Sequence, residues 1–590
     1  MTKVETLGCD ASWGQYPAEE WADALLTAMK LGGVEHLYFV SGTEMSFFQE
    51  ASAKARALGR PAPKLMTMMH ETVALMSALG ESMVTNRPAA TAVHVDVGTL
   101  HYGAGVHAAW RGGYPVLMMA GTAPRAFPGS MRGGRDSNVQ WMQEPRDQAA
   151  IVRQYTKMDH RLEHQDNPGM MVSRLLQVAM SEQKGPVYLS VPRESAMLPI
   201  LGNTRFPTRD ELGLPRPTWP DPEDARTIAH WLVKASNPLV IAERAGRDPQ
   251  AVAELVRLAE LLALPVSETR QADRLNFPMT HDLYDTGPQV RDADAVLVLD
   301  CVSPYLPGLD SPKPDARIAW ISPDPVLSRV KTLEFRADLR IGATPVNVLR
   351  AIHDAAEKML DKADLARIAA RRQRLADRKR EAVARDEQRG QEAGGQSTPS
   401  TRWVAYQLGK ILEPSAILLN DGVSSGAAIR TYAKRVQPLT HFRSGSSAGG
   451  WAPGAAFGAK IAAPERDVVL AGGDGFYAFG TPSSALWAAR RHKAPFLSVV
   501  FCNSAYSTGT TGLAGMYPDG YAVKADCEGG TFEPAPDFTK IAESAGAYGE
   551  NVTETAEVGP ALARGLKHVR DGVAAVIAVR VPSPMQERGA

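Results

Sequence analysis

An aspartate between two glycines, together with an asparagine further along the chain, could hold a metal ion and a phosphate group. Asp474 follows the short apolar run Val468–Ala471, and Asn503 follows a second apolar run, Phe496–Phe501. Residues with helical preference separate the two runs, so the segment is predicted to form a βαβ unit with parallel strands. Ligands of such units collect beyond the carboxyl ends of the strands, where Asp474 and Asn503 both fall. Carboxylate and amide oxygens suit Mg²⁺, which completes its coordination shell with phosphate oxygens and water.

The glycines on either side of this aspartate, Gly473 and Gly475, would let the backbone approach a ligand closely. The helix that follows would offer free N–H groups to a diphosphate. Gly-Asp-Gly alone is also typical of an ordinary turn, because aspartate and glycine both dominate turns. The asparagine at the end of the next strand favours the interpretation as a metal site.

A glutamate near the N-terminus is a candidate for proton transfer. Glu71 falls in the first turn of a predicted helix, and the apolar positions of this helix face a core: Val73, Leu75, Met76, Leu79 and Met83. The helix dipole favours a carboxylate in the first turn, so Glu71 could also be a simple capping residue.

Other candidates lie at predicted strand ends in the same region. Gly42 lies in the loop after the strand expected at His36–Val40, and His94 lies in the strand expected at Ala90–Val95, which leads into one helix through Trp110. Sheet topology would place His94 and His101 near the same edge. A histidine at a strand end can equally be a structural residue.

The composition is that of a large globular protein. The chain has 590 residues, of which 44% are hydrophobic and 22% are charged, and this length is consistent with about three to four domains. Lys+Arg and Asp+Glu are equal at 65 each, so no basic surface favours nucleic acid or a membrane, and we expect small molecules and further copies of the chain as partners. Four cysteines without CxxC spacing indicate neither a disulfide framework nor a zinc site. With no apolar signal segment and no long apolar run, a cytoplasmic location is expected.

The alternation of apolar strands and helical segments predicts an α/β fold with three doubly wound parallel-sheet domains. Their expected ranges are residues 14–200, 220–350 and 401–585, with a charged helix and linker at 351–400. Within that linker, Lys358–Arg389 is predicted as one exposed helix followed by a flexible hinge, and a few apolar residues would anchor it: Leu360, Leu365, Ile368 and Leu375.

Two loops of the third domain could contact a diphosphate or its carrier. Ser424 and Ser425 follow the strand expected at Ala416–Leu419, and their hydroxyls could cradle phosphate oxygens, although a capping turn would explain them equally well. Gly449 lies in the glycine-rich stretch 445–460 that precedes the metal-site strand.

The Gly-Asp-Gly motif, followed by Cys502-Asn503, resembles the cofactor motif of thiamine diphosphate enzymes. The resemblance implies that Asp474, the Asn503 side chain and the Ala505 carbonyl bind Mg²⁺, with Gly473, Gly475 and Phe476 beside the cofactor. Cys502 departs from the pattern, because the family usually has an asparagine there. Gly449 is a second departure, since a Met, Leu or Ile usually supports the bent cofactor at that point. Trp451 or Met516 would then take this role, unless the register differs.

His70-Glu71 is similar to the His-Glu pair of the same family. The match places Glu71 against the aminopyrimidine ring of the cofactor, where a shared proton favours the imino form that deprotonates the thiazolium carbon. Burial should raise the pKa of this carboxyl group. Most members have Ser, Thr or Gly at the position of His94, whereas benzoylformate decarboxylase is similar in having a histidine. His94 and His101 are therefore candidate catalytic residues.

The resemblance implies an enzyme that makes or breaks a C–C bond next to the carbonyl of a 2-oxo acid, with active sites between the chains of a homodimer or homotetramer. An acetolactate synthase-like carboligase is expected, because the sequence has no adjacent His-His pair to supply a proton. One alternative is a benzoylformate decarboxylase-like enzyme with His94 as proton donor, and another is a cofactor-binding protein without catalysis. FAD is unsupported but not excluded, because no G-x-G-x-x-G follows the first strand of the central domain.

Overall fold

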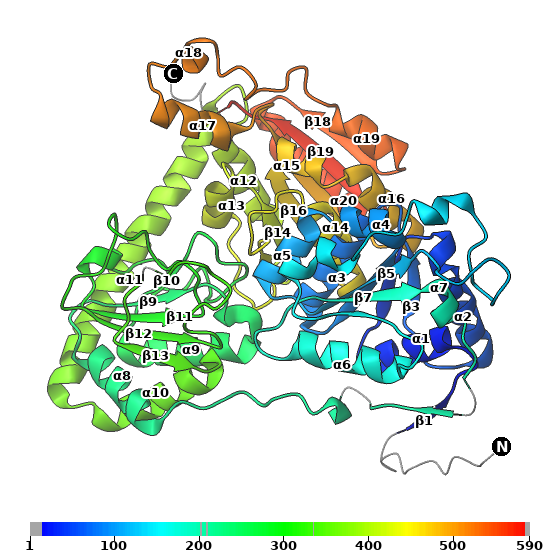
Figure 1. The fold of residues 1–590 in the computed structure, drawn as a ribbon. Helices are drawn as coiled ribbons and strands as arrows, with labels where there is room; N and C mark the ends of the chain where they lie inside the picture. The colour runs from blue at the N-terminus through cyan, green and yellow to red at the C-terminus, as the bar shows by residue number, and fades with distance from the viewer. Residues whose placement is uncertain (1–13, 201–202, 208–209, 334, 584–590) are drawn as a thin grey trace.

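Three parallel sheets, each covered by helices, make up most of the chain (Figure 1). The computed structural model describes residues 14–200, 203–207, 210–333 and 335–583. The predicted fold, α/β with three doubly wound sheets, is confirmed. The expected end of the third domain at residue 585 lies outside the described residues. Among the residues described, no helix has the length and apolar character needed to cross a membrane.

The first sheet has the strand order β3-β2-β4-β5-β7-β6, with every neighbouring pair parallel. Its strands are β2 (His36–Phe39), β3 (Lys64–Thr67), β4 (Ala89–Val93), β5 (Val116–Thr122), β6 (Asp159–Arg161) and β7 (Val187–Pro192). Its helices are α1 (Trp21–Leu31), α2 (Ser46–Leu58), α3 (Glu71–Thr85), α4 (Val95–His101), α5 (Ala104–Gly112), α6 (Pro168–Met180) and α7 (Arg193–Ala196). A short antiparallel pair, β1 (Gln15–Pro17) and β8 (Asn203–Arg205), lies at its two chain ends.

The segment around His94 differs from the prediction of one strand to residue 95 and one helix after it. β4 ends at Val93, and His94 immediately precedes α4. Two helices follow, because Gly103 adopts φ +47° between α4 and α5 and breaks the helical run. His101 is consequently the last residue of α4.

The second sheet has the parallel strand order β10-β9-β11-β12-β13. Its strands are β9 (Pro238–Ala242), β10 (Val266–Glu268), β11 (Ala295–Leu299), β12 (Arg317–Ser322) and β13 (Leu339–Gly342). The helices around it are α8 (Pro222–Lys234), α9 (Pro249–Leu262) and α10 (Pro345–Met359).

The segment Lys358–Arg389 is almost continuously helical, as predicted, but one short break divides it between two helices. α10 ends at Met359, and α11 (Lys362–Glu392) begins after Asp361, whose side chain accepts a hydrogen bond from the N–H of Asp364 at 2.7 Å. The expected boundary at residue 350 falls inside α10. Ile352 of that helix belongs to the core of the second sheet.

α11 packs against the second sheet's helices instead of being fully exposed (Figure 1). Ile368 and Leu375 are buried as expected, whereas Leu365 is 52% exposed and anchors nothing. Arg371 is also buried, and its guanidinium donates to the carbonyl oxygens of Ala235 (2.9 Å) and Leu262 (2.6 Å). These carbonyls end α8 and α9, where helices leave acceptors unsatisfied, so a charged side chain completes the packing.

The third sheet has the parallel strand order β15-β14-β16-β17-β19-β18. Its strands are β14 (Ile417–Asp421), β15 (His441–Phe442), β16 (Val468–Gly473), β17 (Leu497–Cys502), β18 (Tyr548–Val552) and β19 (Ala575–Arg580). Its helices are α12 (Thr401–Ile411), α13 (Gly426–Tyr432), α14 (Ala452–Ala462), α15 (Asp474–Phe479), α16 (Pro482–His492), α17 (Ser507–Met516), α18 (Tyr521–Lys524), α19 (Phe538–Ser544) and α20 (Val558–Arg570).

The first and third sheets pack together through α3 and α14 (Figure 1). Glycines permit the close approach of these two helices. A Cβ at Gly80 would lie 2.1 Å from the carbonyl oxygen of Ala455, and one at Gly458 would lie 1.9 Å from that of Ser77. Neither position can accept a side chain without separating the helices, so both glycines are required by this interface.

Candidate functional site

The carboxyl edge of the third sheet brings Asp474 next to the loop that follows β17. β16 and β17 pair in parallel with Gly473 opposite Phe501, so the two strand ends lie side by side. Asp474 is buried, and its Oδ2 accepts a hydrogen bond from the N–H of Ser504 at 2.7 Å. Its Oδ1 accepts one from the N–H of Gly475 at 2.9 Å. The carboxylate is therefore fixed between the two strand ends.

Asn503 lies in the turn after β17. Its Oδ1 accepts a hydrogen bond from the N–H of Ala505 at 3.0 Å, and Ser504 between them adopts φ +54°. The carbonyl oxygen of Ala505 accepts a bond from the hydroxyl of Ser507 at 3.5 Å. A carboxylate, an amide oxygen and a backbone carbonyl are thus supplied at one edge of the sheet, and these are the donor types that Mg²⁺ takes.

A short helix begins at Asp474 itself, where the sequence pattern predicts only a glycine turn. α15 ends before Gly480, and Thr481, with φ +49°, precedes α16. Burial raises the pKa of Asp474, while the N–H groups of Ser504 and Gly475 lower it. A nearby cation would stabilise the charged carboxylate.

A cavity of about 270 Å³ lies between the end of β14, the loop before α14, and Phe476. Gly449 lines this cavity, and a Cβ there would lie 2.4 Å from the ring of Phe476. The aromatic ring therefore occupies the space that a larger residue at 449 would need. Trp451 is buried and also lines the cavity, whereas Met516 is 72% exposed at the end of α17.

Asp421, which the sequence analysis did not single out, holds the loop that contains Gly449. Its Oδ2 accepts hydrogen bonds from the N–H groups of Gly450 (3.0 Å) and Ala452 (3.4 Å). Burial raises the pKa of Asp421 to about 7, although these N–H groups lower it. The signal that could have found it is an acidic residue at the end of a buried strand, the same position that singled out Asp474.

The residues at this edge fit a diphosphate held through a metal ion. The hydroxyl oxygen of Ser425 is buried and has no hydrogen-bond partner among the described residues, while Ser424 is exposed. No atom lies within 4 Å of a Cβ built on Gly473, so the backbone there is open to a ligand. An orphaned hydroxyl, an open glycine and three oxygen donors are the features that such a group requires.

At the carboxyl edge of the first sheet, Glu71 is the first residue of α3, as the sequence predicts. His70 caps this helix by accepting a hydrogen bond at Nδ1 from the N–H of Thr72 at 3.2 Å. Oε2 of Glu71 lies 3.1 Å from Nδ1 of His101, whose ring stacks on that of His70 with centroids 5.4 Å apart. The ligand atoms of these two histidines and Glu71 lie within 4.8 Å of one another, a spacing that could also hold a metal ion.

His94 pairs with a carboxylate that the sequence analysis did not identify. Its Nε2 contacts Oε2 of Glu44, which is fully buried, and Gln140 donates to the other carboxylate oxygen at 3.0 Å. Burial raises the pKa of Glu44, but hydrogen bonds from His94, Thr43 and Gln140 outweigh it and lower the pKa to about 2. Gly42 adjoins this pair, because a Cβ there would lie 2.2 Å from the ring of His94. An acidic residue two positions after Gly42 in a strand-end loop is the signal that could have found Glu44.

The site residues at the carboxyl edge of the first sheet and those at the carboxyl edge of the third sheet remain separate within one chain. Among the described residues, no hydrogen bond or ion pair joins Glu71 or His94 to Asp474 or Asn503. One group belongs to the first sheet and the other to the third.

Family models match the chain over both groups. The N-terminal TPP binding domain of thiamine pyrophosphate enzymes matches residues 19–151, which include Glu71 and His94. The C-terminal TPP binding domain matches residues 422–579, which include Asp474 and Asn503. The chain belongs to the thiamine diphosphate-dependent enzyme family. Both matched domains are TPP binding domains, so the predicted cofactor of this thiamine diphosphate enzyme is confirmed at the level of the family.

Relatives of this thiamine diphosphate enzyme have several activities. Sulfoacetaldehyde acetyltransferase from Castellaniella defragrans is 26% identical and covers 92% of this chain and 90% of its own. Acetolactate synthase from Bacillus subtilis is 23% identical with coverages of 92% and 90%, and benzoylformate decarboxylase from Pseudomonas aeruginosa is 24% identical with coverages of 74% and 78%. The structure of 4-hydroxybenzoylformate decarboxylase from Rhodococcus jostii RHA1 superposes with a TM-score of 0.75 at 18% identity, covering 95% of this chain and 99% of that chain. At this identity the superposition establishes the fold alone.

Proposed function

We propose that the protein is a Mg²⁺-dependent carboligase that cleaves a 2-oxo acid next to its carbonyl group and joins the acyl fragment to a second carbonyl compound. The acetolactate synthase matches over 92% of this chain, which supports a reaction of this type, and the sulfoacetaldehyde acetyltransferase, which also matches over 92%, supports acyl transfer more generally. Fold alone does not decide the activity, so the proposal depends on the contacts of individual side chains.

Mg²⁺ would be bound by Asp474, the Asn503 amide oxygen and the Ala505 carbonyl, together with phosphate oxygens and water. Ser425 would donate its unpaired hydroxyl to the phosphate, and Asp421 would keep the loop of Gly449 in place around the cavity. When bound, thiamine diphosphate supplies a carbon nucleophile for attack on the substrate carbonyl.

Glu71 would exchange a proton with the aminopyrimidine ring. This role requires a carboxyl group that can both hold and release a proton, with a fixed orientation. The hydrogen bond from His101 and the position of Glu71 at the first residue of α3 supply that orientation. His101 therefore acts on the reaction through Glu71.

The observation that favours acyl transfer over simple release of an aldehyde is the pairing of His94 with Glu44. Glu44 is ionised at neutral pH, because its pKa is about 2, and it engages Nε2 of His94 in a charge-assisted hydrogen bond. With Nε2 engaged in this way, His94 could donate a proton to the reacting carbon only through Nδ1. Slower protonation would give a second carbonyl compound time to react there.

A decarboxylase that releases an aldehyde is the second candidate, and the stacked rings of His70 and His101 favour it. These two imidazoles form a pair in space beside Glu71, although they are 31 positions apart in the sequence. The lack of an adjacent His-His pair in the sequence therefore does not exclude a decarboxylase that releases an aldehyde. Burial lowers the pKa of His70, which favours the neutral form of its imidazole.

A complete site would require a second copy of the chain. The aminopyrimidine group would contact Glu71 of one chain, while the diphosphate would be held by Asp474 of the other, because the two groups of residues are not joined within one chain. A homodimer or homotetramer with active sites between chains satisfies this requirement.

Product analysis tests the proposal. The enzyme is supplied with Mg²⁺, thiamine diphosphate and either pyruvate or benzoylformate, with and without an acceptor aldehyde, and the products are separated by chromatography. An acyloin or a 2-hydroxy-3-oxo acid supports the carboligase. Free aldehyde as the sole product supports the decarboxylase, and tight cofactor binding without any product would indicate a protein that binds the cofactor without catalysis.

A further inference from the structure

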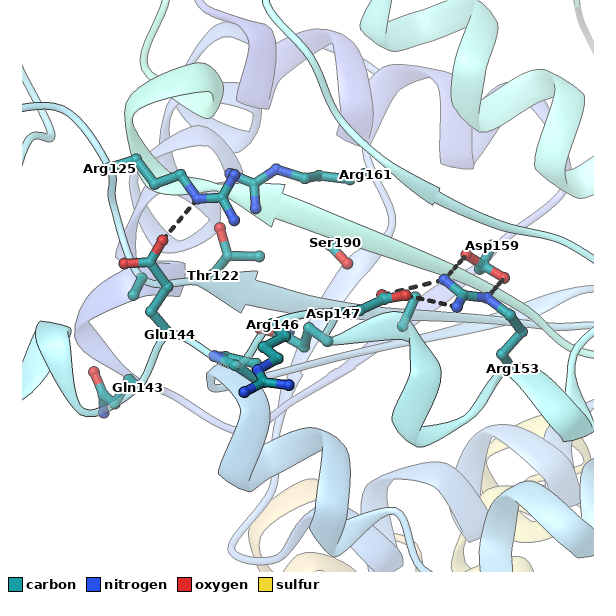
Figure 2. Close-up of a pocket in the computed structure, with 14 residues that line it drawn as sticks. Thr122, Arg125, Gln143, Glu144, Arg146, Asp147, Arg153, Asp159, Arg161 and Ser190 are labelled. Carbon is teal, nitrogen blue, oxygen red and sulfur yellow. Dashed lines mark hydrogen bonds and ion pairs between the residues drawn. The ribbon is translucent and has the colours of Figure 1, made fainter.

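A second cavity, of about 260 Å³, opens at the carboxyl ends of β5, β6 and β7 (Figure 2). Thr122 ends β5, Arg161 ends β6, and Ser190 lies in β7. Segment 143–149 closes the cavity from another side. None of the residues proposed above for the cofactor, the metal ion or proton transfer lines it. Its position beyond strand ends of a parallel sheet is nevertheless where such folds bind ligands.

The charges that line this cavity do not balance. Four arginines and three carboxylates surround it: Arg125, Arg146, Arg153, Arg161, Glu144, Asp147 and Asp159. Arg153 forms ion pairs with both aspartates, since its Nη1 lies 2.6 Å from Asp147 and its Nε lies 2.9 Å from Asp159 (Figure 2). Three arginines and Glu144 remain, and Glu144 also binds Arg135 outside the cavity. Over the whole lining, four arginines face three carboxylates, so one positive charge is in excess, and it lies on the side away from Arg153.

The guanidinium groups of Arg125 and Arg161 lie side by side at one end of this cavity (Figure 2). Nε of Arg125 binds Glu144 at 2.9 Å, and Nε of Arg161 lies 3.5 Å from Glu163. Burial, followed by the charge of Arg125, lowers the pKa of Arg161. Two neighbouring cations repel each other, and an anion between them would relieve the repulsion.

Several polar atoms around the cavity also have no partner. Three buried atoms lack a partner within the described residues: Thr122 Oγ1, Gln143 Oε1 and Gln148 Oε1. Gln148 is held firmly, because its Nε2 donates to the carbonyl of Gly121 (2.8 Å) and to the hydroxyl of Tyr188 (2.9 Å). Buried polar groups normally form hydrogen bonds, so several buried groups without hydrogen bonds around one cavity indicate a missing ligand.

We propose that this cavity is a binding site for a small organic anion, whose carboxylate, sulfonate or phosphate group lies between Arg125 and Arg161. The planar guanidinium fork suits each of these oxyanions and can bind them with two parallel hydrogen bonds. Thr122 contributes a hydroxyl at the same strand end, and the amide oxygens of Gln143 and Gln148 accept from a donor on the ligand. The volume fits a molecule of a few heavy atoms and excludes a nucleotide.

Calorimetric titration of the complete protein, loaded with Mg²⁺ and thiamine diphosphate, tests this site. Acetate, methanesulfonate and inorganic phosphate are titrated separately at constant ionic strength, so that the preferred oxyanion is identified. Saturable binding of at least one anion is expected. Arg161→Gln should weaken it about tenfold or more, because a charge-assisted hydrogen bond is lost. Thr122→Val should weaken it less, without changing the charge.

The matched control is Arg174→Gln, which removes an exposed arginine of α6 that does not line the cavity. This variant should bind the anion as the wild type does. Equal weakening by Arg174→Gln and Arg161→Gln would show a general charge effect and would overturn the proposal. Absence of saturable binding of all three anions would also overturn it. Arg161→Lys keeps the charge, so if Arg161→Gln fails to fold, a partial loss in Arg161→Lys supplies the same test.

Discussion

Nδ1 of His101 lies 3.1 Å from Oε2 of Glu71, and 30 residues separate the two in the sequence. The contact exists because α4 is seven residues long and ends directly over the first turn of α3. A second tether joins the same two helices, since the hydroxyl of Thr72 donates to the carbonyl oxygen of His101. The carboxylate proposed for proton transfer is thus oriented by a side chain of α4, the helix that follows β4, the next strand along the chain.

Glu71→Gln should leave cofactor binding nearly unchanged and slow proton exchange at the thiazolium carbon by about 100-fold or more, because an amide cannot relay a proton. Exchange is followed by NMR after acid quenching, with thiamine diphosphate and Mg²⁺ bound. His101→Ala leaves the carboxyl group in place and should give a smaller reduction. If the Glu71→Gln variant exchanged this proton at the wild-type rate, Glu71 would only cap the helix and would have no role in proton transfer.

Asp474→Ala should abolish Mg²⁺-dependent binding of thiamine diphosphate, because the diphosphate would lose the metal ion that neutralises its charge. Calorimetry measures the binding with and without Mg²⁺. Asp467→Ala is the matched control, since Asp467 lies at the other end of β16 and pairs with Arg570 at 2.7 Å. Unchanged affinity in Asp474→Ala would remove Asp474 from the metal site.

Glu44→Gln should change how stability depends on pH. The pKa of Glu44, about 2, is below the ordinary value of 4.5, so its charge stabilises the fold above pH 4.5 and this contribution is lost as the pH falls towards 2. The difference corresponds to about 3 kcal/mol at most, shared with His94. Thermal unfolding between pH 3 and pH 7 should therefore show a smaller pH dependence in the variant. An identical pH profile would show that the contact with His94 contributes nothing to the fold.

The buried strands, such as β9, β16 and β17, follow from a pattern that the sequence displays, because buried parallel strands are continuous apolar runs. The edge strand β6 (Asp159–Arg161) has no such pattern and was not predicted. The sequence also indicates Asp474, Asn503 and Glu71, since each stands at the end of a strand or the start of a helix. The pairing of Glu44 with His94 could not be predicted, because it depends on side-chain contacts between residues 50 positions apart. Likewise, Gly449 conflicts with the family pattern until the ring of Phe476 is seen to fill its space. The many charged residues of α11 predicted an exposed helix. The helix is packed instead, because the guanidinium of Arg371 is buried and donates to carbonyl oxygens at the ends of other helices.

Asp421→Asn should stabilise the protein at high pH and leave it unchanged at low pH. The pKa of Asp421 in the folded protein is about 7, above its ordinary value of 3.8, because the group is buried. The neutral form is therefore favoured by the fold, and this contribution is fully present below about pH 4 and is lost as the pH rises through 7. An asparagine stays neutral at every pH, and its Oδ1 can accept the same hydrogen bonds from Gly450 and Ala452.

The measurement is the unfolding temperature of the cofactor-free protein at pH 4 and at pH 8.5. The variant and the wild type should unfold at similar temperatures at pH 4, and the variant should unfold at a temperature several degrees higher at pH 8.5. Asp519→Asn is the matched control, because Asp519 is exposed in a turn and its substitution should leave both temperatures unchanged. If Asp421→Asn were less stable than the wild type at pH 8.5, the carboxylate would have to be charged in the folded protein, held by its N–H donors and by Arg443.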